Sequence, residues 1–196
     1  MFNSFNGLNF SLKTLIVLAG VSLSACSSPG IMARHTDTER SAFHFFNSAA
    51  RDGIVRMDIY GNPFNNDTAT FDALVAQKFE GAYIGHPARF STTADHEDFD
   101  NTRVAIYFQP ARGVNRSTIC KPNMQPDPPI MNDSPDFRAI AAFCVGQTSH
   151  SFTTVWSQMA LTFNDPKFID FIKSLARNVI PNPQLEPDNK CTALDC

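Results

Sequence analysis

Apolar side chains recur at helical spacing in three segments of the chain, and each segment begins with a residue that suits a helix cap. The third segment is the clearest, because Pro166 follows the cap and the apolar positions up to Ala176 form one face. We expect helices from Thr36 or Thr38 to Ala50, from Asp67 to Phe79, and from Asn164 or Asp165 to Arg177.

Strict alternation of apolar and polar residues predicts strands at residues 54–60 and 103–109. Residues 138–147 are nearly apolar on both sides, which favours a central strand. Residues 153–162 are ambiguous, but their β-branched start favours a strand that is reached through a connection at residues 146–151. Residues 82–102 read as a loop around one possible short strand at 82–84.

The order of these elements predicts the fold class. A helix, a strand, a helix, several strands and a final helix suggest an α+β domain, with an antiparallel sheet of about four strands and three helices packed mainly on one face. Residues 37–180 form this single domain in our interpretation, and residues 181–196 form a flexible tail.

The pattern at the amino terminus indicates a targeting segment. Residues 15–23 are an apolar run behind Lys13, and nine residues are too few to span a bilayer, which takes roughly 20. The run ends in Leu23-Ser24-Ala25-Cys26, which resembles the lipobox of bacterial lipoproteins. The alternative is a conventional signal peptide with an ordinary cysteine at position 26.

The lipobox resemblance implies that residues 1–25 are removed and that Cys26 carries acyl chains that anchor the protein to a membrane. Residues 26–36 would then be the lipidated cysteine and a tether. Ser27, where an Asp would favour the inner membrane, implies the outer membrane, on its periplasmic side.

The body of the chain carries a second resemblance. Residues 60–64, 103–110 and 141–146, followed by the final amphipathic helix, resemble a group of small, uncharacterised lipoproteins of Gram-negative bacteria. This likeness implies an envelope location and one domain, and it implies no activity.

Four cysteines remain after Cys26: Cys120, Cys144, Cys191 and Cys196. Disulfides persist in the envelope, and four cysteines allow three pairings. We favour Cys120 with Cys144, because Cys144 lies in an apolar run and the bridge would close a long loop, and therefore Cys191 with Cys196.

The composition excludes one class of partner and offers few catalytic candidates. The chain has 16 Lys and Arg against 19 Asp and Glu without a basic cluster, so we expect no nucleic acid to bind. The acidic run at residues 95–100 lacks EF-hand spacing, and the five His (35, 44, 86, 96 and 150) lack a zinc pattern, so we expect no metal and no cofactor. Ser149-His150-Ser151 is better explained by a turn than by a nucleophile and base, and residues 61–64 by a strand end than by a pocket.

The segment at residues 111–136 is unusual for its length, and residues 121–135 hold five of the 13 Pro. It is either an arm that docks on an envelope protein or a mobile loop that a Cys120–Cys144 bridge would clamp. We therefore expect a non-enzymatic binding or assembly module. The alternatives are a small envelope hydrolase with a site assembled from distant residues, and a purely structural component.

Overall fold

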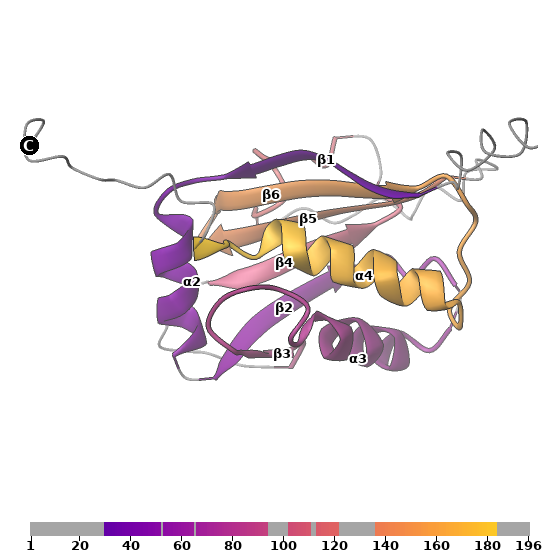
Figure 1. The fold of residues 1–196 in the computed structure, drawn as a ribbon, viewed down its shortest axis with the longest axis horizontal. Coiled ribbons are helices and arrows are strands. Elements are labelled where there is room, and N and C mark those ends of the chain that lie inside the picture. Colours follow the sequence, from indigo (N-terminus) through magenta and orange to yellow (C-terminus); the bar gives the residue numbers. More distant parts are fainter. Residues whose placement is uncertain are drawn as a thin grey trace, which may run out of the picture.

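The computed structural model describes residues 30–51, 53–64, 66–93, 102–110, 113–121 and 136–183. These residues form one six-stranded sheet and three helices (Figure 1). In chain order the elements are β1 (Ile31–Thr38), α2 (Ala42–Ala50), β2 (Ile54–Tyr60), α3 (Thr68–Phe79), β3 (Arg89–Ser91), β4 (Arg103–Phe108), β5 (Phe137–Val145), β6 (Thr148–Ser157) and α4 (Pro166–Val179).

The sheet is mixed, so the prediction of an antiparallel sheet of about four strands is wrong. Its strand order is β1-β6-β5-β4-β2-β3, with β2 parallel to both of its neighbours and the other pairs antiparallel. Parallel neighbours need a crossover connection, and α3 provides it between β2 and β3. The alternation in β2 could not reveal this, because a half-buried strand alternates in either orientation.

Two strands were missed because their residues carry little apolar periodicity. Residues 31–36, expected to belong to the tether, are part of β1, and the first helix begins at Ala42 with Ser41 as its N-cap rather than at Thr36 or Thr38. β1 pairs along β6, from Ile31 with Ser157 to Thr38 with Ser151. Pairing with β6, rather than local propensity, defines this strand. The other missed strand is β3, and residues 82–84 form no strand.

The remaining elements follow the sequence pattern closely. β2 has the predicted bounds, and the Asp67 carboxylate caps α3 by accepting a hydrogen bond from the Thr70 N–H at 2.8 Å. Asp165 caps α4 in the same way through Lys167. β6 begins five residues earlier than expected, because Gly146, with φ at +58°, allows a two-residue turn directly after β5.

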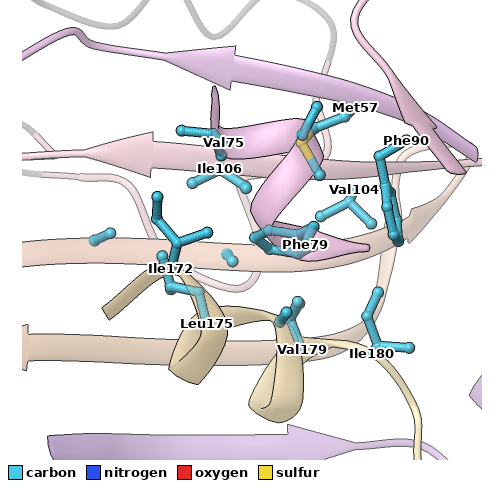
Figure 2. Close-up of a cluster of buried hydrophobic side chains, with 14 of the residues drawn as sticks. Met57, Val75, Phe79, Phe90, Val104, Ile106, Ile172, Leu175, Val179 and Ile180 are labelled. Atoms are coloured by element: carbon cyan, nitrogen blue, oxygen red, sulfur yellow. The ribbon is translucent and has the colours of Figure 1, made fainter. Parts of the chain in front are cut away.

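The main core lies between the three helices and one face of the sheet. Figure 2 shows part of it, in which side chains of α4 such as Ile172 and Leu175 lie opposite Val104 and Ile106 of β4. Phenylalanine dominates this core: Phe71, Phe79, Phe108, Phe143, Phe168 and Phe171 are all essentially inaccessible to solvent. Apolar burial therefore holds the helices on the sheet.

No described helix covers the other face of the sheet, which has its own smaller core. Side chains of β4, β5 and β6 are buried there against Val114, Ile119 and Cys120. We call this side the helix-free face and residues 113–121 the linked segment.

Candidate functional site

The linked segment is joined to the sheet by a disulfide. Cys120 and Cys144 are bonded, which confirms the predicted pairing, and both side chains are buried. Cys144 lies near the end of β5, so the bridge fixes the segment at that end of the helix-free face. Closing a loop of this size stabilises the folded chain by roughly 3 kcal/mol in the chain-entropy model.

Arg103, the first residue of β4, connects three parts of the chain on the same face. Its Nε donates to Asp58 Oδ2 of β2 at 2.9 Å, and its Nη1 and Nη2 donate to the carbonyl oxygens of Gly146 and Cys120 at 3.0 and 2.6 Å. Only 11% of this side chain is exposed. Because each guanidinium nitrogen already binds an acceptor within the protein, the geometry indicates a structural crosslink rather than a ligand contact.

Asp58 and two tyrosines continue the polar cluster along β2 and β4. Asp58 also accepts a bond from Arg56 Nε at 2.8 Å, and the rings of Tyr60 and Tyr107 stack with centroids 4.3 Å apart. Burial raises the pKa of both phenols, and the Asp58 carboxylate raises them further. Both phenols are therefore neutral at and around neutral pH.

A second polar cluster binds the linked segment to the end of β1 and the residue that follows it. Arg116 contacts the carboxylates of Asp37 and Glu39, and Glu39 Oε2 lies 2.8 Å from His150 Nδ1. The Phe45 ring, 40% exposed, packs on the His150 ring at 4.8 Å. The cluster thus joins β1, β6 and the linked segment at the end of the sheet opposite Ile31.

Several predicted site residues lie outside the described residues: Cys26, Cys191, Cys196, His96 and the acidic run at 95–100. The second predicted disulfide and the lipid site therefore remain predictions. His44 and His86 are exposed, on α2 and in the loop after α3, whereas His150 is on β6. The backbone of His35 is part of β1.

Ser149-His150-Ser151 belongs to β6, so the expected turn at these residues is wrong. A shift in the pairing between β5 and β6 occurs there. Ser149 Oγ donates to the Ser151 carbonyl, and Ser151 Oγ lies 3.3 Å from Thr38 Oγ1. Both hydroxyls are thus used in local structure, and neither is placed against His150 as a nucleophile would be.

Residues 61–64 end β2, as the pattern indicated, and they seat Phe64 in the core. A Cβ at Gly61, whose φ is +81°, would lie 2.6 Å from the Phe108 carbonyl oxygen, so only glycine fits. Asn62 Oδ1 accepts from the Phe64 N–H at 3.1 Å. The Phe64 ring then stacks on Phe137 at 5.5 Å.

The roles of Arg103 and Arg116 could not be recognised from the sequence. Alternation in β4 placed Arg103 on the outward side with Ala105 and Tyr107, but nothing indicated that residues 113–121 would cover that side. Within the part of the chain that the structure describes, no three His, Cys, Asp or Glu side chains are grouped to hold a metal ion. No helix among the described elements is both long and apolar enough to cross a bilayer.

Comparisons with protein-family models, with curated proteins and with solved structures found no match to this chain.

Proposed function

We propose that this protein is a lipoprotein anchored in the outer membrane through acyl chains on Cys26, with its domain in the periplasm. The observation that carries the proposal is the sequence Leu23-Ser24-Ala25-Cys26 directly behind an apolar run of nine residues. One acyl chain gives only reversible membrane binding, and two or three give a stable anchor. The disulfide between Cys120 and Cys144 supports the location, because such bonds persist in an oxidising compartment.

The anchor is tested by growing cells that express the full chain with radioactive palmitate. We expect the wild type to incorporate label and Cys26→Ala to incorporate none. Cys191→Ala is the matched control and should be labelled like the wild type. Label on Cys26→Ala would contradict the anchor.

We propose further that the domain is a non-enzymatic binding or assembly module that contacts an envelope protein through residues 111–136. The support is that the residues on either side of positions 122–135 are held by the fold. Cys120 is covalently fixed near the end of β5, and Asp136 directly precedes its start. The 14 residues 122–135 thus connect opposite ends of one strand and begin and end at fixed points.

Photo-crosslinking in intact cells tests this contact. A photoreactive residue at position 124 should form a specific adduct with an envelope protein, and one at Ile84, which is 52% exposed in another loop, should not. Deleting residues 123–134 should abolish co-purification of the same protein. A partner retained after the deletion would exclude this segment as the docking element.

A further inference from the structure

The structure assigns an orientation to the domain at the bilayer: we propose that the end of the sheet at Ile31 faces the lipid headgroups. This inference rests on the proposed acylation of Cys26. The occupant of this surface is the membrane itself.

Only a short stretch of chain separates Cys26 from the fold. β1 begins at Ile31, not after residue 36, so only residues 27–30 separate the lipidated cysteine from the sheet. The five Cα–Cα steps from Cys26 to Ile31 span at most about 18 Å when fully extended. A chain this short holds the Ile31 end of the domain beside the bilayer.

The direction of the strands defines which part of the sheet lies at the Ile31 end. Ile31, Ser157 and Phe137 form one row across β1, β6 and β5, and β2 ends toward the same side. β6 has ten residues, so its two ends are roughly 30 Å apart at 3.3 Å per residue. The cluster around Glu39 and His150 lies at the other end, beyond the reach of the tether.

The two ends of the sheet differ in the side chains that they carry. Two loop stretches at the Ile31 end, residues 61–64 and 158–164, contain no charged residue, and the rings of Phe64 and Phe163 bring them together at 6.1 Å. We call these loops, with Ile31 and Met32, the uncharged end. The described charged residues that border it are Asp67, Asp136, Arg138, Asp165 and Lys167.

The opposite end carries the carboxylates of Asp37 and Glu39 beside Arg116. Removing charges from water against a lipid surface is costly, and a neutral surface with half-buried Met32, Met159 and Phe163 avoids this cost.

The chain supplies its own probe, because its single Trp is at position 156, next to the last residue of β6 and paired with Met32. The acylated full-length protein is reconstituted in phosphatidylcholine vesicles that contain lipid with a nitroxide on the headgroup. Trp156 fluorescence should be quenched strongly. In the matched variant Trp156→Phe/Phe45→Trp, which moves the indole to the opposite end, quenching should fall at least twofold.

A second variant tests the orientation without moving the tryptophan, so that the local environment of the indole stays the same. Inserting 20 Gly and Ser residues after Ser28 should reduce quenching of Trp156 toward the level at position 45. Equal or stronger quenching at position 45 in membrane-bound protein would overturn the orientation and leave the anchor intact. The orientation would also be overturned if vesicle-bound protein showed no quenching at either position. In that case another protein or a second copy of the chain would cover the uncharged end. Failure of the protein to bind vesicles or to carry acyl chains would instead refute the proposed function.

Discussion

The two faces of the sheet are held by different kinds of interaction. Three helices close one face with a continuous apolar core, in which phenylalanine rings pack edge to face and stack. On the helix-free face a nine-residue segment is held by a disulfide, by Arg103 and by Arg116. A short segment without regular structure buries too little apolar surface to remain in place, so covalent and polar bonds supply what packing supplies on the other face.

The largest effect should come from the helix-covered face. Phe168→Ala removes a fully buried ring that contacts Phe64, Phe71 and Phe137. We expect the free energy of unfolding to fall by about 3–5 kcal/mol. Urea unfolding of the mature Cys26→Ser protein, followed by Trp156 fluorescence, measures it. Phe45→Ala on the exposed side of α2 is the control, and an equal loss there would show that burial of the Phe168 ring does not dominate the stability.

The disulfide should come next. Cys120→Ser/Cys144→Ser should lower the free energy of unfolding by roughly 3 kcal/mol, because the unfolded chain regains loop entropy. The same urea experiment applies, with and without a reductant. Reductant should destabilise the wild type and leave this double variant unchanged. If a reductant strong enough to break the bond left the free energy of unfolding of the wild type unchanged, the disulfide would contribute nothing to the stability.

Arg103 should contribute somewhat less. Arg103→Met leaves two backbone carbonyls without their donor and removes a partner of Asp58, and we expect a loss of about 2 kcal/mol. The matched control is Arg56→Met, because Arg56 also binds Asp58 but is 49% exposed, and surface pairs of this kind contribute about 0–1 kcal/mol. Equal losses for the two variants would show that the contacts with Gly146 and Cys120 contribute little.

The smallest effect is a dependence on alkaline pH. Burial raises the pKa of Tyr60, Tyr83 and Tyr107, which are all the tyrosines of the chain. A group whose pKa is higher in the folded state stabilises that state below its unfolded pKa, here about 10, and loses this contribution as the pH rises further. Phenolate absorbance at 295 nm should therefore appear above pH 10, together with loss of structure. A tyrosine that ionises normally in the folded protein would contradict the burial of these phenols.

The elements with strong periodicity could be predicted from the sequence, and the features set by tertiary pairing could not. α3 and α4 have both an apolar stripe and a capping Asp, and the structure confirms their positions. β1 and the parallel pairing of β2 depend on contacts between residues far apart in the chain, which one sequence does not display.

The candidate site shows the same division. The Cys120–Cys144 pair could be chosen because one cysteine lies in an apolar run and the loop between them is long. Arg103 looked like an ordinary outward residue of a strand, and its three acceptors come from β2, from the turn after β5 and from the linked segment. Only the fold brings those groups together.

Amide hydrogen exchange of residues 113–121 tests most directly whether the disulfide holds the linked segment on the sheet. The oxidised wild type is compared with Cys120→Ser/Cys144→Ser by mass spectrometry, with α4 as the internal reference on the other face. We predict that amides such as those of Ile119 and Lys121, which bond only within the segment, lose far more protection than the amides of α4. An equal change in both regions, or no change at residues 113–121, would contradict the account.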